Sequence, residues 1–411
     1  MSQKNKKILV VSQYFWPEDF RVNELVLGLQ ADGHIVEVLT STPNYPSGHT
    51  FPEFQKNASE FSSYNGINIH RVKQIPRGKN KLTLALNYIS FVISSCLYCI
   101  FSLRKNKYDV IFAIQLSPIF SVIPAILCKF LFRIPLHIWV LDIWPDSLFS
   151  SKNFNTYLYK FFNKICCHIY SSADTLRLTS KGFKKRLIAM EVKKPKLLYL
   201  PQWVEQAYKN NNEYGSPEDK QIKSLLSKWS DKKVFLFAGN IGEAQDFDNV
   251  LLSFKKSSQL DDLVFLIVGD GRYKTKLTQL INEYNLENNV FLLGRYPSKF
   301  MPYFYHYSDV LVFSLLDTPI FALTLPGKVQ SYMSSGTMII GMVNGESSAV
   351  INEANCGFTC NSGDVNGFSI LIDQCLTYSN ENLRSIGKNG KEYALRNFDF
   401  NSTIKKLSQS L

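Results

Sequence analysis

Short apolar runs alternate with segments of helical periodicity along the first half of the chain. An apolar run at 8–12 precedes a polar and aromatic loop, a helical segment over about 21–31 and a β-branched run at 36–40. Gly33, between the last two, is a typical helix-ending residue. This order predicts a β-α-β unit with buried parallel strands. Two later apolar runs predict further strands of the same sheet, at 110–114 and 136–141.

The second half of the chain repeats this alternation. Its apolar runs predict a second parallel sheet with strands at 234–238, 264–268, 290–293 and 310–313. We therefore predict an α/β protein with two doubly wound, Rossmann-like domains and a ligand site in the cleft between them, at the carboxyl ends of the strands. The expected domains are 1–200, 201–385 and a C-terminal helix, 386–411, that packs back on the first domain.

One uncharged segment, 82–103, has the hydropathy of a membrane-spanning helix and basic residues on both sides. Spanning would place the strands at 8–12 and 36–40 on one side of a bilayer and those at 110–114 and 136–141 on the other. The first sheet could then not form. Burial in the core and insertion into the membrane interface remain the alternatives. The flanking cations are Lys79, Lys81, Arg104, Lys105 and Lys107.

The net charge of +12 lies entirely in the first half of the chain. Residues 1–200 contain 26 Lys and Arg against 12 Asp and Glu, whereas residues 201–411 contain 20 against 22. An anionic partner of the first domain or an ordinary solvated surface explains this asymmetry. No basic motif interleaved with aromatic residues indicates nucleic-acid binding. The eight cysteines are too few for a disulfide-stabilised secreted domain, so we expect reduced thiols.

Two loops of the second domain have the residues that bind phosphate groups. Gly239-Asn240-Ile241-Gly242 follows a predicted strand and opens a helix, as phosphate-binding loops do, although a tight turn has the same pattern. Lys328 falls in the first turn of another predicted helix, where the helix dipole disfavours a cation. An anion bound beside Lys328 would remove that conflict.

Two further motifs of the second domain resemble known sites only superficially. Gly269-Asp270-Gly271 has no third glycine at dinucleotide-binding spacing, because position 274 is Lys. Asp246-Phe247-Asp248 has metal-ligand spacing but stands where a helix begins, so we expect Asp246 to cap that helix. No two histidines have metal-ligand spacing. We therefore expect no metal site.

Polar residues also follow the predicted strands of the first domain. Asp142-Ile-Trp-Pro-Asp146 ends a buried strand, and Asp146 suits a helix cap better than Asp142 does. Arg21 and the turn that contains Asn44 and Tyr45 lie on loops at the same expected edge. Because functional side chains of α/β sheets gather at this edge, we expect these residues to contribute to a functional site there.

Taken together, several motifs resemble glycosyltransferase family 4, whose members are retaining enzymes of the GT-B fold. The likeness covers nearly the whole chain. Within the family, the sequence looks most similar to the branch that assembles bacterial surface polysaccharides, whose members include the N-acetyl-L-fucosamine transferases of O-antigen pathways. The segments that carry it are ILVVSQYFWPED, GHIVEVLTSTPNYPSG, LDIWPDS, LYLPQWVE, LFAGNIGEAQDFDNVL, FLIVGDG, VFLLGRYP and LPGKVQSYMSSG.

The resemblance implies a site made from both domains. Asp142 would be catalytic on the acceptor side, with Arg21, Asn44, Tyr45 and Asp146 nearby, and Lys328 would be the second catalytic residue. The co-substrate would be a nucleotide diphosphate sugar, for which a UDP-sugar is expected, and neither a metal nor another cofactor would be required. The donor-binding residues would be Gly239, Asn240, Gly242, Gln245, Gly269, Arg295, Lys328 and Ser331.

This chain departs from the family at two points. The family's paired glutamates before Gly336 fall here at Leu323 and Ser331, and its basic pair in the first loop is replaced by Asn240 and Gln245.

A nucleotide-sugar epimerase of the same fold, or a non-catalytic membrane scaffold, remains an alternative. The expected acceptor is a glycan on a polyprenyl diphosphate, in O-antigen or capsule biosynthesis. The expected location is the cytoplasmic face of the plasma membrane, as a peripheral or monotopic protein.

Overall fold

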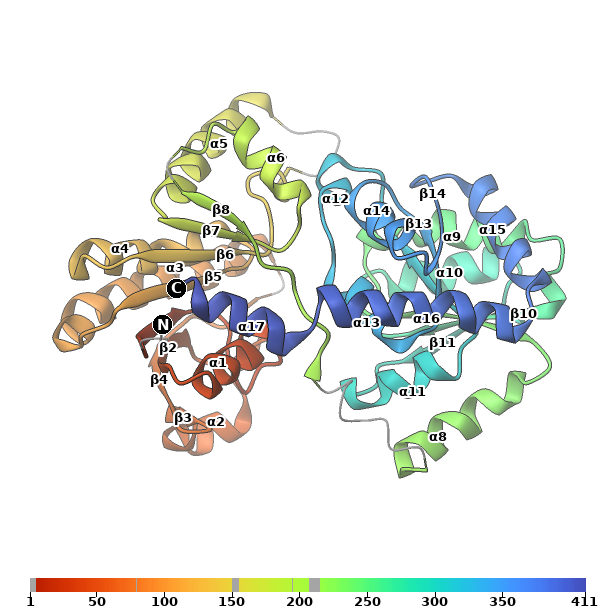
Figure 1. Cartoon of the computed structure of the whole chain (residues 1–411), viewed down its shortest axis with the longest axis horizontal. Coiled ribbons are helices and arrows are strands. Elements are labelled where there is room, and N and C mark those ends of the chain that lie inside the picture. Colours follow the sequence, from red (N-terminus) through yellow and green to blue (C-terminus); the bar gives the residue numbers. More distant parts are fainter. Residues whose placement is uncertain (1–4, 79, 150–154, 194, 207–214) are drawn as a thin grey trace. The chain divides into compact units, whose positions relative to one another are not determined.

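The computed structural model describes residues 5–78, 80–149, 155–193, 195–206 and 215–411. The chain forms two compact units (Figure 1). The first comprises Met1–Pro201 with Asn401–Leu411, and the second comprises Gln202–Phe400. The chain thus returns to the first unit at Asn401, later than the expected residue 386, and 386–400 belongs to the second unit.

The first unit is built on an eight-stranded sheet of order β3-β4-β2-β1-β5-β6-β7-β8. All neighbours are parallel except β3 and β4. The apolar runs of the central strands are almost wholly buried, as continuous runs in a parallel sheet should be. The strands are β1 (Lys7–Val11), β2 (Ile35–Ser41), β3 (Ser63–Tyr64), β4 (Ile67–Val72), β5 (Val110–Gln115), β6 (Leu136–Val140), β7 (Thr175–Leu178) and β8 (Lys196–Tyr199).

The C-terminal helix α17 (Phe400–Gln409) packs on this first unit. His34 Nε2 lies 2.6 Å from Ser408 Oγ, and Arg177 Nη2 donates to the carbonyl oxygen of Ser410 at 2.8 Å. The other helices of this unit are α1 (Arg21–Ala31), α2 (Pro52–Lys56), α3 (Lys81–Phe101), α4 (Ile123–Phe132), α5 (Thr156–Ser171) and α6 (Gly182–Ala189), with 3-10 turns η1 (Ala58–Ser62), η2 (Leu103–Lys105) and η3 (Ile119–Val122).

The second unit has a six-stranded, wholly parallel sheet of order β11-β10-β9-β12-β13-β14. Its strands are β9 (Lys233–Ala238), β10 (Leu263–Val268), β11 (Val290–Gly294), β12 (Val310–Ser314), β13 (Met338–Met342) and β14 (Gly357–Cys360). Its helices are α8 (Pro217–Leu226), α9 (Phe247–Lys255), α10 (Lys274–Glu283), α11 (Met301–His306), α12 (Pro319–Ala322), α13 (Gly327–Ser335), α14 (Glu346–Glu353), α15 (Val365–Thr377) and α16 (Asn380–Asn397), with 3-10 turns η4 (Ser227–Trp229), η5 (Glu243–Gln245), η6 (Leu260–Asp262) and η7 (Ser298–Phe300). The predicted class, α/β with two doubly wound sheets, is confirmed.

Helix α3 has the inverse polarity of an ordinary surface helix. Its buried face includes Asn87 and Ser95 beside Phe91 and Cys99. Its outer face carries large apolar side chains at helical spacing, here called the α3 stripe: Leu82, Leu86, Ile89, Ile93, Leu97, Ile100 and Phe101. Within the segment Leu82–Phe101, which is long and apolar enough to cross a membrane, only 22% is buried. Full burial in the core, one of the two alternatives, is thereby excluded.

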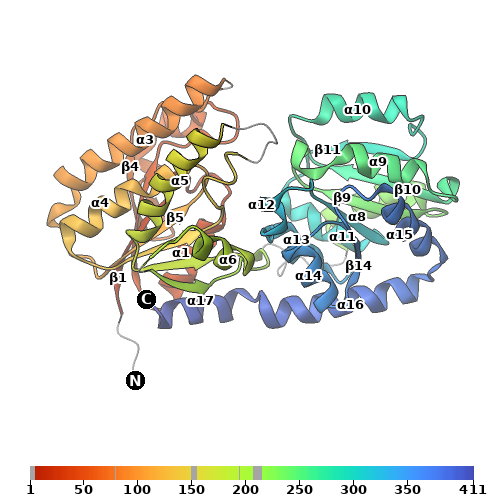
Figure 2. The same ribbon diagram turned by 90° about the horizontal axis from the view of Figure 1, so that it is seen from above.

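The position of α3 in the fold agrees with the argument against spanning. It packs beside α4 in the first unit (Figure 2). It connects β4 to β5, and both strands belong to the same sheet. Its apolar face is therefore presented from the outside of a folded unit.

Candidate functional site

The second unit brings Lys328 directly against the first glycine loop. Lys328 is the second residue of α13, and its Nζ lies 3.6 Å from the centre of the Phe237 ring at the end of β9. A Cβ atom on Gly239 would stand 2.7 Å from that same Nζ. Among the residues that the structure describes, none forms a hydrogen bond or ion pair with the Lys328 ammonium group. The cation and the loop that the sequence suggested separately thus form one arrangement.

Tyr332 holds this arrangement together, and the sequence did not reveal it. It lies one helical turn after Lys328, is fully buried, and its hydroxyl contacts the end of β9. The hydroxyl accepts from the Ala238 amide at 2.8 Å and donates to the Ala238 carbonyl at 3.2 Å. Tyr332 therefore fixes α13 to the residue that precedes Gly239. The spacing of four between Lys328 and Tyr332 was the available signal, because such residues share a helix face.

Burial lowers the pKa of Lys328 to about 7. The ammonium form loses solvation in this position, and the N-terminal end of α13 carries partial positive charge. The ring face of Phe237 compensates only in part. A bound anion would favour the charged lysine, so the geometry suits a phosphate group.

The second glycine motif supports the first through close backbone contact. Gly269 has φ +149°, and a Cβ there would stand 1.9 Å from the Gly239 carbonyl oxygen. A Cβ on Gly271 would stand 2.1 Å from the carbonyl oxygen of Ile241. Only glycine permits this approach. The motif that resembles a dinucleotide fingerprint therefore has a structural explanation in the packing of two loops.

The structure corrects one expectation about the first loop, that its amides are free to bind phosphate. Gly239 N donates to the carbonyl oxygen of Val268 and Ile241 N to that of Asp270, each at 2.9 Å. Gly242 N donates to Gln245 Oε1 at 3.0 Å. These three N–H groups therefore already have acceptors, in the neighbouring loop after β10 and in the side chain of Gln245. The backbone N–H of Asn240 has no acceptor among the described residues.

The remaining donor-side candidates differ in their availability. Asn240 and Arg295 are exposed, and Arg295 directly follows β11. Gln245 uses its side-chain oxygen to cap η5 through the amide of Gly242. Ser331 is buried, and its hydroxyl donates to the Gly327 carbonyl within α13 at 3.1 Å.

The Asp-x-Asp motif is held by neighbouring side chains. Asp246 stands at the expected N-cap position, directly before α9, but its side chain accepts no capping hydrogen bond from the helix backbone. Its carboxylate accepts from Asn249 Nδ2 at 2.9 and 3.0 Å instead. Asp248 pairs with Lys276 at 3.0 Å and accepts from the Tyr273 hydroxyl. Within the described ranges, no group of three or more His, Cys, Asp or Glu side chains could hold a metal ion.

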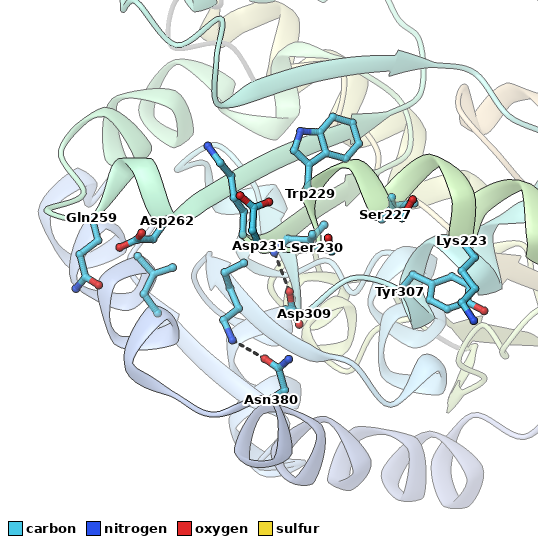
Figure 3. Close-up of a pocket in the computed structure, with 15 residues that line it drawn as sticks. Lys223, Ser227, Trp229, Ser230, Asp231, Gln259, Asp262, Tyr307, Asp309 and Asn380 are labelled. Carbon is cyan, nitrogen blue, oxygen red and sulfur yellow. Dashed lines mark hydrogen bonds between the residues drawn. The ribbon is translucent and has the colours of Figure 1, made fainter.

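A pocket of about 590 Å³ lies at the opposite edge of the second sheet (Figure 3). Lys233 and Asp309, at the amino ends of β9 and β12, line it. Lys233 Nζ donates to Asn380 Oδ1 at 2.6 Å, and Asp309 Oδ2 accepts from the Val234 amide at 2.8 Å. These contacts fasten the amino ends of the strands to α16 and to one another. The pocket is thus separate from the Lys328 arrangement, which lies at the carboxyl edge.

In the first unit, Asp142 follows β6 at the carboxyl edge of the sheet. Burial raises the pKa of its carboxyl group, although hydrogen bonds from Ser147 and other neighbouring groups act to lower that pKa. Ser147 Oγ donates to Asp142 Oδ1, and Trp144 Nε1 donates to Ser117 Oγ at 2.9 Å nearby. A carboxyl group with a raised pKa at this edge is chemically suited to proton transfer.

Arg21 and Asp146 lie among charged partners. Arg21 begins α1 and forms an ion pair with Glu24 at 3.7 Å. Asp146 accepts from Arg186 Nε at 3.0 and 3.1 Å and from the Tyr159 hydroxyl at 3.4 Å. Asp146 therefore has a structural role in joining the loop after β6 to α5 and α6.

Asn44 and Tyr45 are joined to the loop after β1 by Glu18, a residue that the sequence did not single out. The Glu18 carboxylate accepts from the amides of Asn44 at 2.8 Å, Tyr45 at 2.7 Å and Phe15 at 3.2 Å. Burial raises the pKa of Glu18 to about 7 despite these bonds. Asn44 itself is buried, whereas Tyr45 is partly exposed. Neighbouring Asp19 carries the same kind of side chain, so sequence alone could not single out Glu18.

Comparison with known protein families finds two matches that together cover most of the chain. Residues 20–203 match the glycosyl transferase 4-like domain, and residues 218–393 match the glycosyl transferases group 1 family. These matches correspond to the two units of the structure, and they place the two candidate regions in different domains.

Three curated relatives show moderate identity. The probable glycosyltransferase WbjE of Pseudomonas aeruginosa is 25% identical over 57% of this chain and 59% of its own length. WcaI of Escherichia coli, a glycosyl transferase assigned by its name to colanic acid biosynthesis, is 25% identical over 69% of this chain and 71% of its own. A Campylobacter jejuni N-acetylgalactosaminyltransferase, named for a diphospho-undecaprenol acceptor, is 26% identical over 42% and 46%. The chain thus spans about three fifths of the length of the Pseudomonas relative.

A solved structure supports the fold over the full length. HepE of Anabaena, crystallised in complex with UDP, has a TM-score of 0.71 at 15% identity and covers 98% of this chain and 99% of its own. At this identity the likeness concerns the fold, which is GT-B, as predicted.

Proposed function

Since this chain has the GT-B fold and matches two glycosyl transferase families over most of its length, we propose that it is a glycosyltransferase, which transfers a sugar from a UDP-sugar to a glycan carried on a polyprenyl diphosphate at a membrane surface. The observation that carries the donor half is the position of Lys328, against Gly239 and without a counter-charge among the described residues. The complex of HepE with UDP supports the choice of nucleotide. The diphospho-undecaprenol in the name of the Campylobacter relative supports the choice of acceptor.

The mechanism follows from where charge develops. As the anomeric carbon–oxygen bond breaks, negative charge grows on the departing diphosphate, and a fixed cation lowers that barrier. The Lys328 side chain, the Asn240 N–H and the backbone N–H groups of Gly327 and Lys328, the first two of α13, are the groups available for this role. Asp142, with its raised carboxyl pKa, would accept the proton of the attacking hydroxyl or orient that hydroxyl.

The finer assignments of this proposal rest on the family resemblance. The sugar would be an N-acetylated deoxyhexosamine such as N-acetyl-L-fucosamine, the linkage would be formed with retention, and no metal would be required. The product would enter O-antigen or capsule synthesis on the cytoplasmic leaflet. Colanic acid synthesis in the name of WcaI is of the same kind.

The proposal is tested by offering a panel of UDP-, GDP- and dTDP-sugars with a polyprenyl-diphosphate-linked glycan and measuring products by mass spectrometry. We expect a mass increase of one sugar with a UDP-sugar, both with and without EDTA. A product that forms only with a GDP- or dTDP-sugar would contradict the donor assignment. Conversion of the nucleotide sugar itself, with no transfer, would indicate an epimerase.

The affinity for UDP should depend on pH through Lys328. Its pKa of about 7 in the free protein means that the cation is lost as pH rises, and binding favours the protonated form. We therefore expect the Kd for UDP to rise between pH 7 and 9, by up to about tenfold per pH unit. Isothermal titration calorimetry measures this. Lys328→Arg, which stays charged, should show a flat profile, and an equal slope in that variant would remove Lys328 from the effect.

The membrane half of the proposal rests on the polarity of α3. An outer face of large apolar side chains in contact with water costs hydrophobic free energy, which insertion into the headgroup region would recover. Arg104, Lys105 and Lys107 are exposed directly after this helix, whereas Lys79 lies outside the described residues. Apolar face and cations together suit an anionic bilayer surface.

Flotation with anionic vesicles tests this association. Replacing Arg104, Lys105 and Lys107 by Gln should lower binding about tenfold or more at low salt, because each cation near the surface contributes about 1 kcal/mol. The matched control replaces three exposed lysines of the same domain, Lys181, Lys184 and Lys185, and should bind nearly as wild type does. Failure of the wild type to float would contradict the membrane assignment.

A further inference from the structure

Arg77 occupies the carboxyl edge of the first sheet, among the loops after β1 and β2. Its backbone amide donates to Asn44 Oδ1 at 3.0 Å. Gly48, at φ +78°, approaches so closely that a Cβ there would stand 2.1 Å from the Arg77 carbonyl oxygen. The segment around Arg77 is therefore held in place by the turn that contains Asn44 and Gly48.

The Arg77 guanidinium contacts three tyrosine side chains. Its carbon lies 5.5 Å from the centre of the Tyr45 ring, and Nη1 donates to the hydroxyls of Tyr14 at 3.2 Å and Tyr88 at 3.3 Å. No carboxylate among the described residues pairs with it, and Nη2 and Nε have no acceptor there. The neighbouring Arg71, in contrast, donates to three main-chain carbonyls. The Arg77 guanidinium is therefore held in a fixed orientation, and its Nη2 and Nε donors have no acceptor among the described residues.

Arg77 also stands at the beginning of the α3 stripe. Tyr88, one of its partners, belongs to α3, and a Cβ on Gly78 would collide with Thr83 in the first turn of that helix. Buried Asn87 ties the same helix to the loop after β1 through Gln13 Nε2 at 3.2 Å. An exposed apolar surface therefore starts where the guanidinium is fixed.

We propose that Arg77 binds the diphosphate of a polyprenyl diphosphate whose hydrocarbon chain lies along the α3 stripe. This inference rests on the proposed function for its ligand class. A planar guanidinium matches phosphate oxygens through two parallel hydrogen bonds, and an isoprenoid chain matches an apolar helix face. A ligand with only one of these parts would use only part of this surface. Arg77 would place the acceptor at the edge where Asp142 follows β6.

The probe for this inference is farnesyl diphosphate, a short and soluble polyprenyl diphosphate, titrated in the presence of saturating UDP so that the Lys328 site is occupied. Arg77→Gln should weaken its binding about ten- to a hundredfold, the effect of losing a charge-assisted bidentate contact. Arg77→Lys keeps the positive charge but cannot form two parallel hydrogen bonds to a phosphate, so its affinity for farnesyl diphosphate should lie between those of wild type and Arg77→Gln. Arg133→Gln, which removes an exposed arginine of the same domain, should bind as wild type does.

Comparison ligands distinguish binding of the diphosphate group from binding of the hydrocarbon chain. Leu86→Gln and Ile89→Gln should weaken farnesyl diphosphate and leave inorganic pyrophosphate unchanged, whereas Arg77→Gln should weaken both. Equal binding of farnesyl diphosphate by wild type and Arg77→Gln would overturn the inference. A second outcome would also overturn it. If dioctanoylphosphatidylglycerol bound as tightly as farnesyl diphosphate and depended on Arg77 to the same extent, the ligand of this surface would be a bulk lipid headgroup. If UDP failed to bind but farnesyl diphosphate still required Arg77, the donor proposal would fall and this inference would stand.

Discussion

Lys328→Ala should lower kcat for sugar transfer about a hundred- to a thousandfold while the protein stays folded. Removal of one preorganised group that stabilises developing negative charge costs roughly 2.7–4 kcal/mol in comparable sites. Lys328 fits that description because its Nζ lies against Gly239 with no ion-pair partner among the described residues. Initial rates with the UDP-sugar that forms product, together with thermal unfolding, measure the effect.

The control for this substitution is Lys388→Ala, an exposed lysine of α16 in the same domain. It should leave kcat within about twofold, as surface substitutions do. A folded Lys328→Ala protein with near-normal kcat would show that another group meets the diphosphate. Arg295 would then be the first residue to test, since it is an exposed cation after β11.

Gly269→Ala should both destabilise the second domain and weaken UDP binding. The new Cβ would stand 1.9 Å from the Gly239 carbonyl oxygen, and φ +149° is unfavourable for any side chain. Because both obstacles are backbone features, we expect a loss of about 2–4 kcal/mol in the free energy of unfolding. Displacement of Gly239 from Lys328 should raise the Kd for UDP by at least about tenfold.

Gly294→Ala is the control for Gly269→Ala, because it introduces backbone strain without a steric clash. Gly294 also has a left-handed backbone, φ +78°, but nothing lies within 4 Å of its added Cβ. We expect a loss of only about 1–2 kcal/mol there, and little change in UDP affinity. Similar UDP affinities for Gly269→Ala and wild type would show that the packing of the two glycine loops does not shape the donor site.

The central strands of both sheets could be predicted from the sequence because they are continuous apolar runs. β5 and β6, for example, are completely buried and were predicted almost to the residue. Strands β3, β4, β7, β8, β13 and β14 were not predicted. β7 contains Arg177, whose partner Ser410 lies 233 residues away, and no local pattern predicts such a contact. β13 is a short apolar run, and periodicity alone does not distinguish such a run from a buried helix.

The candidate site was predictable where single residues conflict with their local setting. Lys328 was noticed because a cation at a helix start is unfavourable, and the structure adds its contact with Gly239. Glu18, Tyr332 and Arg77 were not found. Each acts through partners from distant loops or helices, so its role depends on tertiary contacts that one sequence does not reveal.

The structure of the complex with UDP tests the central claim most directly. We predict that the diphosphate lies within hydrogen-bonding distance of Lys328 Nζ, at the carboxyl edge of the second sheet, with the Asn240 N–H as a further donor. A UDP molecule bound in the pocket at the opposite edge, beside Lys233 and Asp309, or bound with its diphosphate away from Lys328, would contradict the account.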